Sequence, residues 1–163
     1  MLLGRKVVPP PHVRAALGAI FAGAAPALIA EVRIVEHSLF ARLHGRAIAT
    51  TRRRRIFLRG SAAEFFGDPA LMLHEYCHVL RQWEPGTLTT LGYLRECLRR
   101  GYWENRFEVE ARAFAREHAG RFGEILRVAH VDGVASRTPR LNLAAEQPRT
   151  LEPERQPRSD SRR

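Results

Sequence analysis

Lysine is almost absent from this sequence: Lys6 is the only one, although lysine and arginine together number 27 and the net charge is +10. The basic excess is therefore carried by arginine. Such an excess can reflect genome composition as readily as a polyanionic partner, and net charge alone bears on association rather than on fold. We therefore do not expect nucleic acid as the partner.

Long apolar runs are also missing. No stretch of about 18 uninterrupted apolar residues exists, so no transmembrane helix is expected. The nearest approach, residues 15–30, is rich in alanine and glycine. Prolines 9–11 interrupt the approach to it, and Leu28 stands where a cleavage site requires a small residue, so a cleaved signal peptide is not expected either.

Cysteine is scarce, with Cys77 and Cys97 as the only two. Both lie among apolar residues, where a thiol behaves as a small buried hydrophobe, and two cysteines do not make a disulfide framework. This favours a cytoplasmic location, with secretion by a route that needs no signal peptide left open.

A length of 163 residues leaves room for one domain with a core. From Arg137 onward the chain is rich in proline, arginine and glutamate and has almost no large apolar residues. We therefore predict a single domain over residues 1–136 and a disordered tail over 137–163.

Hydrophobic periodicity along the domain predicts an α+β fold, with a small sheet packed on a central helix and further helices after it. Asp68 and Pro69 have the residue types of an N-cap and a first helical position, so the central helix should begin there. The expected elements are a helical lead-in over 11–30, strands over 32–35, 47–50 and 56–58, and helices over 69–83, 88–100 and 105–122, the last ending at Gly123.

One motif on the central helix carries specific chemistry: residues 74–78 read His-Glu-Tyr-Cys-His, the HExxH pattern. Residues four apart share a helix face, so His74 and His78 can reach one ion. Glu75 projects beside that ion and can act as general base for a metal-activated water. The other faces of this helix are apolar, and polar groups are costly to bury without a partner. The motif therefore predicts a zinc ion bound by His74 and His78, with Glu75 as the catalytic residue.

A catalytic zinc site needs a third protein ligand. Glu108 and Glu110 are two residues apart on a predicted helix, about 200° around its axis, so only one of them can face the ion. Glu108 shares its face with the small Ala111, which would allow close approach to the central helix, and we predict Glu108 as the third ligand. Glu110, His118 and His130 remain alternatives.

A different role for Glu108 also stays open. Asn105 with a glutamate three residues later resembles a capping box, in which the carboxylate would bond the backbone of Asn105.

HExxH followed by a helix with Glu108-x-x-Ala111 resembles the gluzincin metallopeptidases, and this resemblance implies that Glu108 is the third zinc ligand. Arg112 stands where gluzincins usually carry aspartate. More broadly, residues 11–119 resemble an uncharacterised bacterial zincin-like domain that is also found as a core domain in proteins linked to extracellular contractile injection systems. The matching segments are Val32-Arg33-Ile34, residues 46–49, 56–58 and 73–79, and 108–111.

We therefore expect a zinc-dependent hydrolase, a metallopeptidase that acts on a peptide or protein substrate. A strand before the central helix, residues 56–59, is expected to pair with an extended substrate. Two alternatives are a catalytically silent zinc-binding module that contacts another protein, and an arginine-rich nucleic-acid-binding protein. The aromatic residues Tyr93, Tyr102 and Trp103 receive no catalytic role, and the sequence gives no expectation of oligomeric state.

Overall fold

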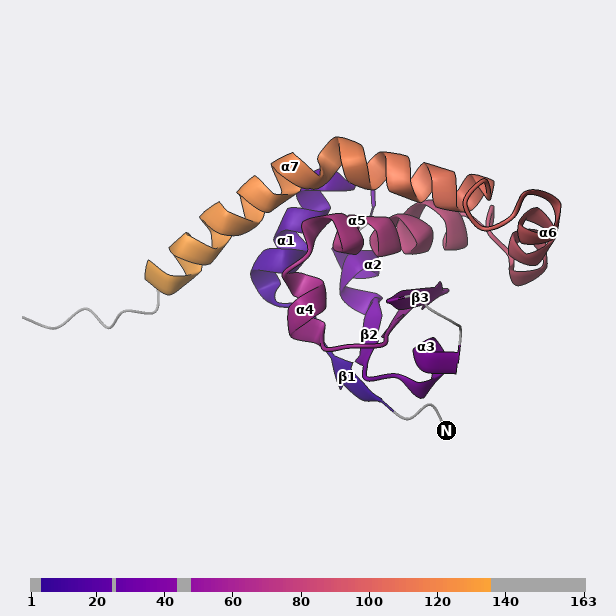
Figure 1. The fold of residues 1–163 in the computed structure, drawn as a ribbon. Coiled ribbons are helices and arrows are strands. Elements are labelled where there is room, and N and C mark those ends of the chain that lie inside the picture. Colours follow the sequence, from indigo (N-terminus) through magenta and orange to yellow (C-terminus); the bar gives the residue numbers. More distant parts are fainter. Residues whose placement is uncertain (1–3, 25, 44–47, 136–163) are drawn as a thin grey trace, which may run out of the picture.

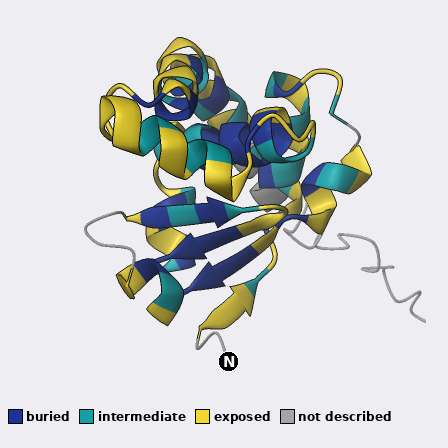
Figure 2. Ribbon diagram, turned by 90° about the vertical axis from the view of Figure 1, so that its right-hand side faces the viewer, coloured by how far each residue is buried: buried dark blue, intermediate teal, exposed yellow. Residues whose placement is uncertain are grey.

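The computed structural model describes residues 4–24, 26–43 and 48–135, with only the backbone described for 130–135. The predicted tail over 137–163 lies outside the described residues. Within the described part the fold is α+β, as predicted, with one small mixed sheet and a set of helices (Figure 1). Most of these helices lie on one side of the sheet (Figure 2).

The sheet has four strands in the order β1-β2-β4-β3. The strand β2 (Arg33–Glu36) pairs antiparallel with β1 (Arg5–Val7) and parallel with β4 (Arg55–Leu58), while β4 pairs antiparallel with β3 (Ala49–Arg52). The predicted strands over 32–35 and 56–58 are confirmed within a residue, and the strand predicted at 47–50 lies at 49–52. β1 had not been predicted.

The strand that we expected to pair with substrate occupies the wrong position for that role. β4 lies between β2 and β3, so both of its edges are already paired. A two-residue turn at Arg53 and Arg54, with Arg54 at φ 57°, connects β3 to β4 and leaves β3 at the edge of the sheet. The prediction for residues 56–59 is therefore wrong, and among the described strands β3 is the edge beside the central helix.

The helices place one long element over the central helix. Figure 1 shows α7 passing over α5 and α1, with α6 at the far end. The helical elements are α1 (Pro11–Ile20), α2 (Pro26–Glu31), α3 (Leu39–Leu43), α4 (Ala62–Phe66), α5 (Pro69–Cys77), the π-helix η1 (His78–Trp83), α6 (Thr90–Arg100) and α7 (Arg106–Ala135). The lead-in predicted over 11–30 is thus two helices, because the chain bends after Phe21 and Gly23 adopts φ 103°.

The start of α5 follows the prediction and the end of α7 does not. Asp68 accepts a hydrogen bond from the Leu71 N–H at 2.9 Å, and Pro69 is the first helical residue. α7 continues well beyond Gly123, where it was expected to end. Phe122 is fully buried and residues 125–126 also pack on the core, so the buried face of α7 extends past Gly123 and keeps the chain helical.

One hydrophobic core joins the sheet to the helices. Its members come from β2 and β4 on one side and from α5 and α7 on the other: Ile34, Ile56, Leu58, Met72, Leu73, Tyr76, Phe114 and Phe122 are among them. This packing holds the remaining face of α5, which does not pack on the core, between β3 and the start of α7. Within the described residues, none of the helices combines the length and the apolar character needed to cross a membrane.

Candidate metal centre

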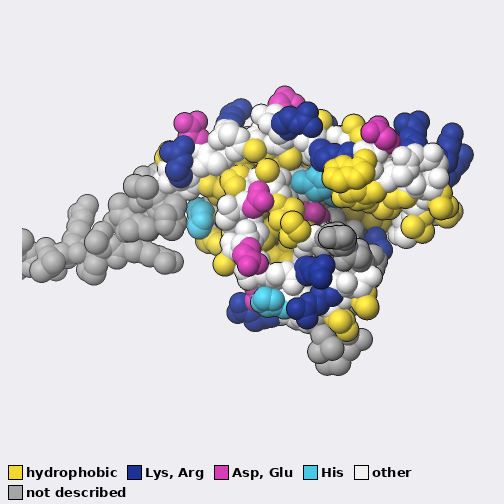
Figure 3. Space-filling view, in the orientation of Figure 1, with side chains coloured by type: hydrophobic (Ala, Val, Ile, Leu, Met, Phe, Trp, Pro, Cys, Tyr) yellow, Lys and Arg dark blue, Asp and Glu magenta, His cyan; other side chains and the backbone are white. Residues whose placement is uncertain are grey.

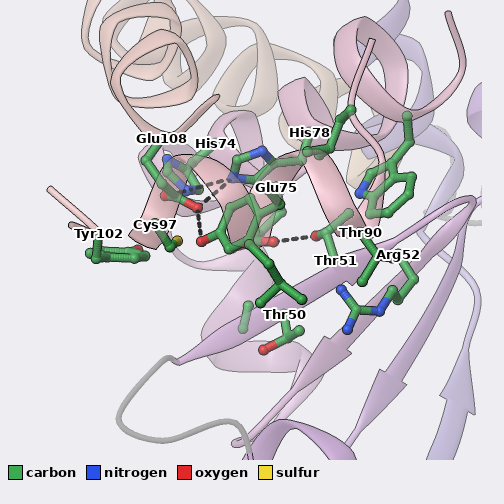
Figure 4. Close-up of a pocket in the computed structure, with 15 residues that line it drawn as sticks. Thr50, Thr51, Arg52, His74, Glu75, His78, Thr90, Cys97, Tyr102 and Glu108 are labelled. Atoms are coloured by element: carbon green, nitrogen blue, oxygen red, sulfur yellow. Dashed lines mark hydrogen bonds and ion pairs between the residues drawn. The ribbon is translucent and has the colours of Figure 1, made fainter. Parts of the chain in front are cut away.

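The two motif histidines point their Nε2 atoms at each other from neighbouring turns. His74 lies in α5 and His78 begins η1, and their Nε2 atoms are 3.1 Å apart (Figure 4). Both side chains are largely removed from water, with His78 only 6% exposed. In a metal-free site one of the two facing nitrogens must carry a proton, whereas a cation between them accepts both lone pairs.

The first turn of α7 brings Glu108 to the same point. Its Oε2 lies 3.3 Å from Nε2 of His74, and its Oε1 lies 3.5 Å from Nε2 of His78. Four ligands arranged tetrahedrally about zinc at about 2.0–2.1 Å lie about 3.3 Å from one another. The three side chains that the sequence singled out are therefore brought together at separations that fit a zinc ion.

The bonding of Glu108 favours a cation as well. Its Oε1 accepts a hydrogen bond from the Tyr93 hydroxyl at 2.8 Å, but its buried Oε2 has no hydrogen-bond partner among the described residues. An ionised oxygen left without a partner in the interior is costly. A metal ion at the meeting point of the three side chains would satisfy this oxygen.

The electrostatics of the cluster also attract positive charge. Burial works against ionisation of Glu108, but the neighbouring His74 and His78 and the hydrogen bond from Tyr93 outweigh it and hold the pKa of Glu108 well below its usual value. Burial likewise disfavours a charged His78, yet the carboxylates of Glu108 and Glu75 raise its pKa.

The competing candidates for the third position lie elsewhere. Glu110 is not a member of the cluster: its carboxylate accepts a hydrogen bond from Gln82 at 3.1 Å, lies 3.6 Å from Arg81, and has its side chain 45% exposed. His118 stacks edge-on against Phe114 and is not a member of the cluster, and the side chain of His130 is outside the described residues.

The capping alternative for Glu108 is not the arrangement observed. The Asn105 side chain caps α7 by accepting from the Phe107 N–H, and the backbone N–H of Asn105 donates to the Tyr102 carbonyl. The carboxylate of Glu108 therefore does not cap α7 and instead contacts Tyr93 and the two histidines.

Gln82 fixes the hydrogen position on His78. Its side-chain Nε2 donates to the Phe107 carbonyl at 3.0 Å, and a carbonyl can only accept, so the amide oxygen of Gln82 must face His78. That oxygen lies 2.7 Å from Nδ1 of His78, which is therefore the protonated nitrogen. Nε2 of neutral His78 keeps its lone pair, directed toward His74 and Glu108.

The predicted general base occupies a separate position on the same helix face. Glu75 is 5% exposed, lies outside the three-residue cluster, and accepts a hydrogen bond from the Thr51 hydroxyl on β3. Figure 4 shows this bond crossing from the helix to the edge strand. Thr51 thereby orients a carboxylate that is free of the ligand cluster.

A cleft of about 440 Å³ opens onto these groups between β3 and α6. Its floor holds His74, Glu75, His78 and Glu108, and its two walls are residues 49–52 on one side and α6 on the other. A second cavity of about 930 Å³ continues past Tyr102 and shares Ala49, His74, Glu75 and Tyr102 with the first. We call the two together the trench.

The backbone of β3 faces the trench. Arg52 and Arg55 flank the two-residue turn and therefore form a hydrogen-bonded pair. Along an antiparallel ladder, hydrogen-bonded and non-hydrogen-bonded pairs alternate. Ala49 and Thr51 therefore direct their N–H and C=O groups away from β4.

Several residues of the site had not been identified from the sequence. Thr51 and Tyr93 reach it from β3 and α6, and no local pattern marks a threonine or a tyrosine for such a role. Gln82 could have been found, because it follows His78 by four residues and so lies on its helix face.

Comparisons with known proteins return no relative: no family model, no curated protein and no solved structure matches the chain.

Proposed function

We propose that the chain is a zinc-dependent peptidase of the gluzincin type, with His74, His78 and Glu108 as zinc ligands and Glu75 as general base. The observation that carries the proposal is the convergence of two Nε2 atoms and a carboxylate at separations of 3.1–3.5 Å, with Oε2 of Glu108 buried and unpartnered. This donor set of nitrogen and oxygen atoms is the one that catalytic zinc sites use.

Zinc bound there would polarise a substrate carbonyl and acidify a water molecule. Glu75 is placed to take the proton from the attacking water and to pass it to the leaving nitrogen, because its carboxylate lies beside the cluster without belonging to it. The Thr51 hydroxyl holds this carboxylate in one orientation. Tyr93 does the same for Glu108, and burial together with that carboxylate raises the pKa of Tyr93, so its hydroxyl remains a donor.

A polypeptide is the substrate class that the trench fits best. The trench extends to both sides of His74 and Glu75, as a chain passing over the site requires. The outward N–H and C=O groups of Ala49 and Thr51 offer an extended chain the hydrogen bonds of one more strand. A small-molecule substrate would use neither feature.

The test is peptide hydrolysis by the Glu75→Gln protein. A library of unstructured peptides serves as the substrate, and mass spectrometry detects the cleavage products. The change should abolish cleavage and leave zinc bound, since Glu75 is the base and not a ligand. Glu117→Gln, an exposed carboxylate change on α7, serves as the control and should cleave like the unmodified protein. Cleavage that survives in the Glu75→Gln protein contradicts the mechanism. Zinc binding without cleavage by the unmodified protein would instead identify a non-catalytic zinc module.

A further inference from the structure

The trench has a cationic end that the proposed chemistry does not use. Arg52 lines the cleft beside Trp83 and Thr90, and the same three residues line a smaller cavity of about 360 Å³ that also contacts Arg53 and Arg55. The trench therefore runs from Arg112 and Arg116 beyond Tyr102, past the His74–Glu108 cluster, to a group of arginines at the turn after β3.

The guanidinium of Arg52 has no acidic partner among the described residues. It lies over the ring of Phe40, 5.4 Å from the ring centre. The nearby Glu84 is occupied by Arg54, which bonds it at 2.7 Å and also pairs with Glu31. The positive charge of Arg52 therefore remains available at the trench.

The two faces of β3 differ in character, which sets a pattern for a strand added beside it. Ala49 and Thr51 are buried toward α5, whereas Thr50 and Arg52 are half-buried on the opposite face. An added strand places its own side chains alternately on these two faces. Side chains opposite Arg52 would lie beside the guanidinium, and their neighbours would point toward α6.

The α6 wall is apolar. Its trench-facing side includes Leu94 and Cys97, with Leu88 and Trp83 completing the wall. Leu94 is 53% exposed, and no residue of α6 is fully buried, so the side chain of Leu94 is open to the trench. Figure 3 shows hydrophobic side chains gathered at and below α6.

We propose that the trench selects an extended polypeptide segment in which large apolar side chains, directed at Leu94, alternate with carboxylates, one of them opposite Arg52. This inference rests on the proposed function for the idea that a substrate chain lies along β3, and adds the chemistry of that chain. Opposite charges across neighbouring strands attract and like charges repel, so Arg52 discriminates in both directions.

Binding is the direct test, measured with zinc-loaded Glu75→Gln protein so that cleavage does not interfere. Two short labelled peptides alternate leucine with aspartate or leucine with lysine, which removes any need to know register or direction. We expect the aspartate peptide to bind about tenfold more tightly at low salt, and Arg52→Glu to remove or reverse that preference. Arg121→Glu, an equal charge change on an exposed residue of α7 away from the trench, should leave the preference intact.

The proposed contact between the apolar side chains of the peptide and Leu94 is tested in the same assay. Leu94→Asn should weaken binding of the aspartate peptide several-fold, because the leucine side chains of the peptide lose their apolar wall. Leu98→Asn changes a leucine of the same helix that is 88% exposed and does not line the cleft, and it should have no effect. Unchanged zinc affinity in all four variants shows that the fold and the metal site are intact.

The outcomes separate this inference from the proposed function. Equal binding of the two peptides, or binding of neither, overturns the inference, even if the unmodified protein cleaves other peptides. A preference for the aspartate peptide that depends on Arg52, without cleavage by the unmodified protein, supports the inference and contradicts the peptidase proposal.

Discussion

The amide oxygen of Gln82 lies 2.7 Å from Nδ1 of His78, and this contact leaves Nε2 of the ring directed at His74 and Glu108. Gln82 is fully buried and its amide also bonds the Phe107 carbonyl, so the motif helix and α7 are joined one turn beyond His78. The orientation of His78 thus depends on a residue outside the HExxH motif.

Gln82→Leu should weaken zinc binding roughly tenfold to a hundredfold, because Nδ1–H of His78 loses its acceptor and the ring loses its fixed orientation. The measurement is zinc affinity by chelator competition. Arg81→Gln, at a half-exposed neighbour, should bind zinc normally. Unchanged affinity in Gln82→Leu would show that the ring is held by other contacts.

Thr51→Val removes the hydroxyl that Glu75 accepts from while keeping the shape of the side chain. A hydrogen bond to a charged group contributes about 1.5–3 kcal/mol, so kcat/KM should fall roughly tenfold to a hundredfold. Zinc affinity should not change, since Thr51 contacts none of the three proposed ligands. An equal loss of zinc affinity and of kcat/KM would mean that Thr51 positions the three proposed ligands rather than Glu75.

The sequence predicted what local patterns determine. The N-cap at Asp68 and the shared helix face of His74 and His78 follow from helix geometry, and the structure agrees with both. Glu108 rather than Glu110 lies beside the two histidines, and its role as a zinc ligand stays a prediction. The position of β4 inside the sheet could not be predicted, because strand order depends on which distant segments pair. The end of α7 was misjudged because Gly123 was interpreted without knowing what it packs against.

A substitution at Gly123 tests that last difference. In the continuous helix a methyl group at this position would meet Pro69 Cγ at 3.7 Å, an ordinary contact. Gly123→Ala should therefore raise the free energy of unfolding by about 0.5–1 kcal/mol. Gly101→Ala is the contrasting case, since Gly101 adopts φ 75° after α6 and the change should destabilise by about 1 kcal/mol or more. Urea unfolding of both variants provides the values, and destabilisation by Gly123→Ala would indicate a helix end.

Acid should weaken the fold through Glu36. Its carboxylate accepts hydrogen bonds from the Ala62 N–H and from Arg5, and both lower its pKa from the usual 4.5. A carboxyl whose pKa is depressed in the folded state stabilises above its unfolded pKa, and this stabilisation is lost as pH falls through the folded pKa. Melting temperature should therefore drop as pH is lowered below about 4, and less so in Glu36→Gln. An identical acid profile in that variant would assign the effect to other groups.

The identity of the third ligand tests the central claim most directly, by zinc affinity measured against a chelator at neutral pH. Glu108→Gln removes the charge that lies 3.3 Å from His74 and 3.5 Å from His78, whereas Glu110→Gln alters a half-exposed carboxylate two residues further on. Our account predicts one zinc site per chain in the unmodified protein, strong loss of affinity in Glu108→Gln, and at most a modest change in Glu110→Gln. Tight zinc binding by Glu108→Gln together with loss in Glu110→Gln would contradict it.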